Sequence, residues 1–251
     1  MLNVVRHASE GSLKPLLIVH GLYGSARNWG VISKRLSTDR DVIAVDQRNH
    51  GDSPWFDTHS YSDMARDLAE VIEANEQPMD VLGHSMGGKA AMVLALTRPE
   101  LVNRLIIADI APVAYGHDQS QYIEAMQSLD LSKIEKRSQA NEALAEFIDD
   151  PALCSFFTQS LDIKSRRWKL NLDVLAKDMH HILGFPEIGG AFQGNTLFLS
   201  GSESNYVKTE HRPVIKSKFP NAKFAKIPGA GHWLHAEKPR KFEATVRAYL
   251  T

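Results

Sequence analysis

Cysteine is nearly absent from this chain of 251 residues, in which Cys154 stands alone. A single cysteine excludes an intrachain disulfide and is typical of proteins from a reducing compartment. Because Cys154 lies in an apolar stretch without a glycine turn, we interpret it as a buried structural thiol rather than a nucleophile. Long hydrophobic runs are missing as well, so no segment is expected to cross a membrane. Residues 1–7 lack the pattern of a signal segment, and together these absences predict a cytoplasmic protein.

An excess of either charge is missing too. The chain has 29 basic and 30 acidic residues and a formal net charge of -1. This balance excludes the basic field that nucleic-acid binding or a polybasic membrane anchor requires. The His-Glu-x-x-His spacing of zinc proteases does not occur, so no metal site is expected. With no sign of an obligate protein partner, a small molecule is the expected partner.

Short apolar runs alternate with helix-like stretches along most of the chain. Such alternation predicts a parallel sheet covered by helices on both faces. The expected strands are residues 16–19, 42–45, 79–82, 105–108, 196–200 and 222–227. The expected helices include residues 61–74, 88–96 and 242–250. We therefore predict one α/β domain over residues 1–251, which suits a chain of this length.

The segment from about residue 112 to 185 differs from the rest. It contains helical stretches such as 122–129 and 139–148 but no convincing strand. We interpret it as a helical cap that folds over the carboxyl edge of the sheet, where it forms an acyl pocket and excludes water. The alternative is a purely structural insertion that stabilises the core. The core is then expected at about 1–111 and 186–251.

The pentapeptide at residues 83–87, Gly-His-Ser-Met-Gly, matches the pattern Gly-x-Ser-x-Gly. In this pattern a strand turns sharply into a helix and holds the serine hydroxyl out at the top of a sheet. The glycines are needed because strand and helix approach closely there. The pattern alone arises by chance, but here it lies between an expected strand and an expected helix. Ser85 is therefore predicted to be a nucleophile rather than part of a surface turn.

A serine hydroxyl needs a base to remove its proton. We assign this role to His232, which lies in a glycine-rich loop just after the last expected strand. Chain order favours this choice, because hydrolases of this topology place the histidine after the serine and the acid. His235 is expected to pack locally. The adjacent His180 and His181 are expected to point apart on a helix.

The acid that orients the histidine is harder to place. Its usual position is the loop after the penultimate strand, but the chain has Ser204 where an aspartate is expected, and Glu203 is displaced by one residue. Asp109 ends a buried strand at the same edge of the sheet, where a buried carboxylate has few other roles. We predict Asp109 as the acid, with Glu203 as the alternative.

Two backbone N–H groups are expected to bind the oxyanion of the reaction. Met86 follows the nucleophile and begins its helix, so its N–H is the first predicted donor. Leu22 follows the first apolar strand within the tripeptide His-Gly-Leu, and its N–H is the second. An ordinary strand-ending turn is the alternative interpretation of that tripeptide.

Three segments together resemble the α/β-hydrolase superfamily and, within it, the YbfF-type bacterial esterases. They are residues 46–54, 83–90 and 229–239, and residues 107–113 are similar too. The resemblance implies an α/β-hydrolase fold, with a mostly parallel central sheet flanked by helices and a helical cap inserted after the strand that ends at Asp109. It implies a cofactor-free hydrolase of short acyl esters and acyl-CoA thioesters. Members of that family also lack the aspartate in the loop after the penultimate strand, which supports Asp109.

The chemistry expected from these residues is ester or thioester hydrolysis through an acyl-enzyme on Ser85. His20, Tyr206 and Trp233 are expected to contact the substrate together with residues of the cap. Two alternatives stay open. The fold also hosts other cofactor-free reactions, such as carbon–carbon hydrolysis and haloperoxidation, and it can persist in a binding protein without turnover.

Overall fold

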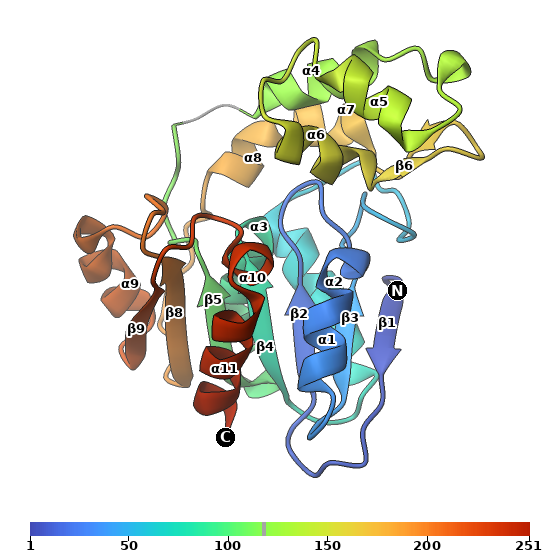
Figure 1. The fold of residues 1–251 in the computed structure, drawn as a ribbon. Coiled ribbons are helices and arrows are strands. Elements are labelled where there is room, and N and C mark those ends of the chain that lie inside the picture. The colour runs from blue at the N-terminus through green and yellow to red at the C-terminus, as the bar shows by residue number, and fades with distance from the viewer. Residues whose placement is uncertain (117–118) are drawn as a thin grey trace.

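The computed structural model describes residues 1–116 and 119–251, and its centre is a seven-stranded sheet in the order β1-β3-β2-β4-β5-β8-β9 (Figure 1). The strands are β1 Val4–His7, β2 Leu16–Val19, β3 Val42–Val45, β4 Met79–His84, β5 Val102–Ala108, β8 Asn195–Gly201 and β9 Ala222–Ile227. Strand β1 pairs antiparallel with β3, and the other pairings of this sheet are parallel. The predicted α/β fold with a mostly parallel sheet is confirmed.

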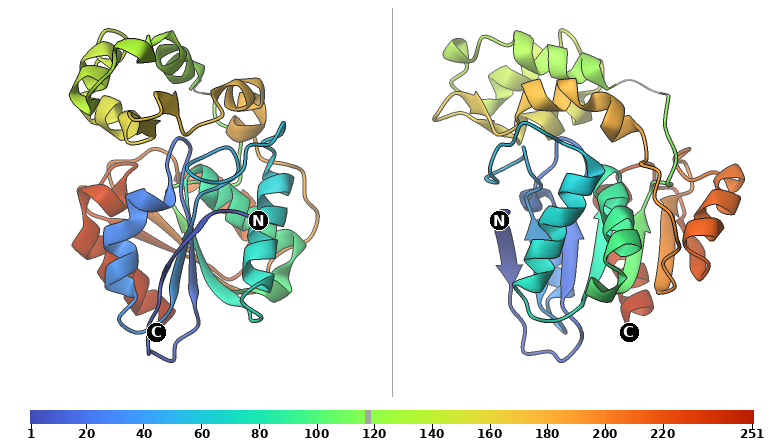
Figure 2. Two further views of the ribbon diagram at one scale, coloured as in Figure 1. Left: turned by 90° about the vertical axis from the view of Figure 1, so that its right-hand side faces the viewer. Right: turned by 180° about the vertical axis from the view of Figure 1, so that it is seen from behind.

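Helices cover both faces of the sheet because its central strands are apolar on both faces. Strands β2 and β3 are fully buried runs, LLIV and VIAV. One face carries α1 (Gly30–Leu36) and α11 (Pro239–Leu250), and the other carries α2 (Tyr61–Glu73) and α3 (Met86–Thr97) (Figure 2). Successive residues of β2 alternate between the two sides, so that Leu17 and Ile18 belong to separate hydrophobic clusters.

Between β5 and β8 the chain forms a layer of helices that lies over the carboxyl ends of the parallel strands, at the top of Figure 1. They are α4 Ser120–Ser128, α5 Arg137–Leu144, α6 Pro151–Thr158, α7 Leu172–Lys177 and α8 Met179–Leu183. We refer to residues 112–185 as the cap. The expectation that this segment holds no strand is wrong, since β6 (Leu161–Asp162) pairs antiparallel with β7 (Arg167–Trp168). Strands of two residues are too short to leave a pattern in the sequence.

Several short elements lie outside the predicted set. Strand β1 is an edge strand of four residues whose side chains are largely exposed, so it lacks the apolar run that marks the other strands. The remaining elements are α9 Arg212–Lys218, α10 Leu234–Glu237 and the 3-10 turns Ala26–Trp29, Pro99–Leu101, Leu131–Lys133 and Thr209–His211. Across the described residues, no helix has both the length and the apolar composition needed to cross a bilayer.

Candidate active site

Ser85 lies in a strained turn between β4 and α3. Its backbone angles are φ 52° and ψ -122°, a combination that residues other than glycine rarely adopt. A Cβ atom on Gly83 would lie 2.3 Å from the carbonyl oxygen of Gly87, and one on Gly87 would lie 2.3 Å from the carbonyl oxygen of His20. Strand and helix therefore approach as closely as the pentapeptide predicts, and the turn presents the serine at the carboxyl edge of the sheet.

The structure brings Ser85, His232 and Asp109 into one hydrogen-bonded chain. The Ser85 hydroxyl lies 3.1 Å from Nε2 of His232, and Nδ1 of His232 lies 2.7 Å from Oδ2 of Asp109. Because a carboxylate accepts, Nδ1 carries the proton and donates, which leaves Nε2 to accept from the serine hydroxyl. This is the geometry that general-base activation of a serine requires.

Asp109 is fully buried just beyond β5 and has a φ of 54°. Its Oδ1 accepts a hydrogen bond from the Gly201 N–H at 3.1 Å, and its Oδ2 accepts one from the Ser204 hydroxyl. Ser204, which stands where the sequence pattern predicts an aspartate, thus supports the carboxylate of Asp109. Glu203 is exposed and accepts from the Ser202 hydroxyl instead. Of the two predicted acids, the structure brings Asp109 to the imidazole and leaves Glu203 at the surface.

The loop that carries His232 is held by two residues that sequence reasoning missed. The Glu237 carboxylate accepts hydrogen bonds from the N–H groups of Gly231 and Trp233, on either side of His232. Nε2 of His84 donates to the carbonyl oxygen of His232 at 2.9 Å. Burial, with a smaller effect of nearby histidines, lowers the pKa of His84 well below its usual value, so this ring stays neutral. Neither Glu237, at the end of α10, nor His84, beside Ser85, has a signal in the sequence that points to these contacts.

The two predicted oxyanion donors, Leu22 and Met86, both line the cavity at Ser85. Among the described residues, neither backbone N–H has a protein acceptor. Gly21 packs against the nucleophile, because a Cβ atom on it would lie 3.2 Å from the Cβ of Ser85. One donor follows β2 and the other begins α3, so both residues lie at the edge of the sheet where Ser85 stands.

A cavity of about 340 Å³ lies between the edge of the sheet and the cap. Its apolar lining from the cap includes Leu153, Phe156 and Ile182. Two of the predicted substrate contacts, Tyr206 and Trp233, line it as well, and the Tyr206 ring stacks on the imidazole of His232 with 4.0 Å between ring centres. A cavity of this size suits a small acyl group.

His20, the third predicted substrate contact, lines the cavity but uses its polar atoms inside the protein. Its Nδ1 donates to the Gly21 carbonyl oxygen at 2.7 Å, and its Nε2 accepts from the Gln47 N–H at 2.9 Å. Both ring nitrogens are therefore committed, and His20 presents ring carbons to the cavity. The structure makes it a support of the turn after β2 instead of a polar contact for substrate.

The two linkers of the cap meet at Lys89, one helical turn after Ser85. Nζ of Lys89 donates to the carbonyl oxygens of Leu183, at 2.9 Å, and of Gly184. The N–H of Tyr115, in the linker that leaves the core, donates to the same Leu183 oxygen at 3.0 Å. Burial lowers the pKa of Lys89 from 10.5 to about 7. The helix that begins next to the nucleophile is thereby tied to both ends of the cap.

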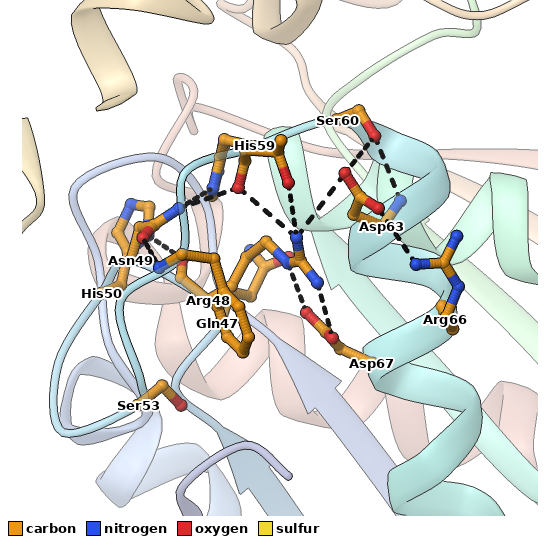
Figure 3. Close-up of polar contacts among 12 residues, drawn as sticks. Gln47, Arg48, Asn49, His50, Ser53, His59, Ser60, Asp63, Arg66 and Asp67 are labelled. Carbon is orange, nitrogen blue, oxygen red and sulfur yellow. Dashed lines mark hydrogen bonds and ion pairs between the residues drawn. The ribbon is translucent and has the colours of Figure 1, made fainter. Parts of the chain in front are cut away.

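The loop between β3 and α2, which contains segment 46–54 and is drawn in Figure 3, provides a second attachment for the cap through Asn171. Arg48 donates to both carboxylate oxygens of Asp67 at 2.6 and 2.9 Å, which fixes the loop on α2. The carbonyl oxygen of Asn49 accepts from the N–H of Asn171 in the cap at 3.0 Å, and its side-chain oxygen accepts from the Asn171 amide at 3.1 Å. The loop therefore lies between the core and the cap and contacts both.

Three other sequence predictions can be compared with the structure. Cys154 is buried, and His235 packs locally, stacked on Trp29 with 4.1 Å between ring centres. The prediction for His180 and His181 is wrong: their ring centres lie 3.8 Å apart, because both side chains are exposed and can turn toward each other. In the part of the chain that the structure describes, no three His, Cys, Asp or Glu side chains are grouped as they would be to hold a metal ion.

Comparison with known proteins identifies the family of this fold. A family model described as the alpha/beta hydrolase fold matches residues 14–239. The chain belongs to this family. The resemblance inferred from the three sequence segments is therefore confirmed.

The relatives with curated names include a lipase and an esterase. The sn-1-specific diacylglycerol lipase ABHD11 of Mus musculus is 37% identical over 252 residues, which cover 96% of this chain and 82% of the relative. Esterase YbfF of Escherichia coli (strain K12) is 36% identical over 240 residues, which cover 94% of this chain and 92% of the relative. A solved structure described as a marine microorganism esterase is 38% identical, has a TM-score of 0.93 and covers 99% of this chain and 100% of its own. The fold of that esterase therefore matches both the core and the cap of this chain.

Proposed function

We propose that this protein is a serine hydrolase that cleaves carboxylic esters or acyl-CoA thioesters of small acyl substrates. The observation that carries the proposal is the hydrogen-bonded chain from Ser85 through His232 to Asp109, at the edge of a largely apolar cavity. The names of the curated relatives, an esterase and a lipase, support ester hydrolysis.

In the first half-reaction, the Ser85 oxygen attacks the acyl carbonyl carbon while Nε2 of His232 takes the hydroxyl proton. The carbonyl oxygen becomes an oxyanion, which accepts hydrogen bonds from the N–H groups of Leu22 and Met86. Asp109 holds the imidazole with Nδ1 protonated and stabilises its positive charge. The imidazolium then gives its proton to the leaving alcohol or thiol. The bond between this group and the acyl carbon breaks, and the acyl group stays on Ser85.

In the second half-reaction, water takes the place of the leaving group. Nε2 of His232 removes one proton from the water, whose oxygen attacks the acyl carbon. The same two N–H groups bind the second oxyanion, and the proton returns to the Ser85 oxygen as the free acid departs. The cap side chains of the cavity, such as Leu153 and Phe156, would hold the acyl chain throughout.

Two competing functions share most of this geometry. Another cofactor-free reaction, such as carbon–carbon hydrolysis or haloperoxidation, could use the same serine and histidine. A binding protein could keep the fold without turnover. Both are separated from the proposal by measuring the product that forms and whether Ser85 becomes covalently labelled.

The experiment uses the full chain with a fluorophosphonate probe and with p-nitrophenyl and acyl-CoA substrates of graded acyl length. We expect stoichiometric labelling and hydrolysis by the wild-type protein, both lost in Ser85→Ala. The Ser138→Ala variant, which removes an exposed serine on α5 of the cap, serves as the control and is expected to react as the wild type does. Folded wild-type protein that is neither labelled nor active on any of these substrates would contradict the proposal. Turnover of a carbon–carbon substrate alone would favour the first competitor.

A further inference from the structure

The Leu22 N–H belongs to the Gly21–Leu22 peptide group, and this group and the next one are held by different contacts. The carbonyl oxygen of the Gly21–Leu22 peptide accepts from Nδ1 of His20 at 2.7 Å. The N–H of the next peptide, that of Tyr23, donates to Nε2 of His50 at 3.2 Å. Because each peptide group is planar, contacts to these two atoms fix the direction in which the Leu22 N–H points.

The turn that carries Leu22 needs such contacts, because its backbone is strained. Tyr23 has a φ of 63°, a left-handed conformation that residues other than glycine rarely adopt. The ring of His50 is fully buried, with its centre 5.2 Å from that of His20. Its Nδ1 donates to the Arg48 carbonyl oxygen at 3.0 Å, so its Nε2 has no proton and can accept from Tyr23. Nδ1 of His50 thus binds its own loop, and Nε2 binds the turn that carries Leu22.

The loop that carries His50 is itself fixed on two sides. Figure 3 shows the Arg48 side chain on Asp67 of α2, at the start of this loop. On the other side, a β-bridge joins His50 to Leu170 of the cap. His50 therefore stands between a fixed part of the core, the docked cap and the turn after β2. The reaction described above gives this buried ring no part.

We propose that His50 is a positioning residue of the oxyanion site: its Nε2 holds the Tyr23 N–H and thereby aims the Leu22 N–H at the reacting carbonyl oxygen. The inference rests on the proposed function, since an oxyanion forms when Ser85 attacks a carbonyl carbon. His50 contributes through the backbone of the turn. Its contribution therefore belongs to turnover and not to substrate binding.

The test compares two amide variants of His50. In His50→Gln the side-chain oxygen can take the place of Nε2 and accept from Tyr23, whereas the shorter amide of His50→Asn can replace Nδ1 alone. We expect His50→Asn to lower kcat for p-nitrophenyl acetate about 10- to 100-fold, which is less than the loss from a deleted donor, and to leave KM within about 2-fold. His50→Gln is expected to stay within about 3-fold of the wild-type kcat.

A second readout separates the oxyanion site from a general loss of structure. The same proteins are assayed on the matching thionoester, in which sulfur replaces the carbonyl oxygen and accepts hydrogen bonds weakly. A misdirected N–H slows the oxygen ester more than the thionoester, so the ratio of the two rates is expected to fall about 10-fold in His50→Asn. Phe219→Leu, a change in the core next to β8, is the control. It is expected to lower the Tm and to leave the ratio unchanged.

The outcomes distinguish this inference from the proposed function. If the wild-type protein hydrolyses none of the p-nitrophenyl esters and acyl-CoA substrates of graded acyl length, the proposed function fails. If the wild-type protein is active but His50→Asn keeps its kcat and its rate ratio, or if His50→Gln loses as much as His50→Asn, the role of His50 is overturned and the proposed function stands. Should His50→Asn not fold, His50→Phe, which fills the same buried space without an acceptor, takes its place in the comparison.

Discussion

The two sides of Ser85 are built in different ways. On one side, His232 and Asp109 face the serine with side chains that are joined by direct hydrogen bonds. On the other side, Leu22 and Met86 offer backbone N–H groups, whose positions depend on the turn after β2 and on the start of α3. A substitution can delete a side chain, but every substitution other than proline leaves the backbone N–H in place. We call His232 and Asp109 the side-chain side, and the N–H groups of Leu22 and Met86 the backbone side. Activity that depends on the side-chain side is lost when the reacting residues themselves are substituted. Activity that depends on the backbone side is lost when the residues that hold the turn are changed.

Apart from substitution of Ser85 itself, the largest effect is expected at Asp109, the buried acid of the side-chain side. In Asp109→Asn an amide replaces the carboxylate that accepts from Nδ1 of His232, so the imidazole loses the partner that fixes its tautomer. We expect kcat to fall about 10³- to 10⁴-fold, with little change in KM. The matched control is Glu203→Gln, which alters an exposed carboxylate and is expected to leave kcat within about 2-fold. Equal effects of the two substitutions on kcat would show that Asp109 is not the acid.

The backbone side is tested by adding one atom beneath the turn. A Cβ on Gly21 would lie 3.1 Å from Nδ1 of His84 and 3.2 Å from the Cβ of Ser85, so the turn must move by a few tenths of an ångström. Because this displaces the Leu22 N–H, we expect Gly21→Ala to lower kcat about 10-fold. A Cβ on Gly30 would meet nothing within 4 Å, and Gly30→Ala is expected to keep the wild-type kcat. An unchanged kcat in Gly21→Ala would remove the contrast between the two sides.

The two sides also differ in how far the sequence predicts them. Ser85 and His232 carry local signals, a glycine elbow and a glycine-rich loop after a strand, and Asp109 follows from its place at a strand end. The supports of the backbone side have no local signal. His50 meets the turn because the loop after β3 folds back over 27 residues of sequence, a contact that depends on tertiary structure.

The same reason separates the core from the cap. The strands of the core are continuous apolar runs because both of their faces are buried, so composition alone predicts them. The cap helices are short and bury one face each. Their ends depend on turns and caps such as the Asp150 side chain, which accepts from the N–H of Ala152 at the start of α6. Periodicity in the sequence does not locate such ends, and the helix predicted at 139–148 ends at Leu144 in the structure.

Lys89 bears on the backbone side, because it ties the cap linkers to the helix that begins at Met86. Burial lowers its pKa from 10.5 to about 7, so between these pH values the unfolded chain binds a proton that the folded protein has released. Stability of the wild-type protein therefore rises with pH across this window, and Lys89→Met lacks this dependence. From about pH 6.5 to about pH 9, we expect the Tm of the wild type to gain about 5–10 °C on that of Lys89→Met. A Tm difference that does not vary with pH would contradict the buried, easily deprotonated lysine, and Lys34→Met, at an exposed helical lysine, is the control.

The smallest effect is expected at Ser204, which hydrogen-bonds to Asp109 but to neither Ser85 nor the imidazole of His232. Its hydroxyl donates to Oδ2 of Asp109, and in Ser204→Ala the carboxylate still accepts from the Gly201 N–H and from Nδ1 of His232. We therefore expect kcat to fall about 2- to 5-fold, the loss of one hydrogen bond among several.

The double variant decides whether this loss passes through Asp109. If Ser204 acts by supporting that carboxylate, Ser204→Ala costs nothing further once Asp109→Asn is present, and the two effects on kcat are not additive. Full additivity would mean that the hydroxyl serves the reaction independently of the acid. In that case Ser204 would itself belong to the side-chain side of Ser85.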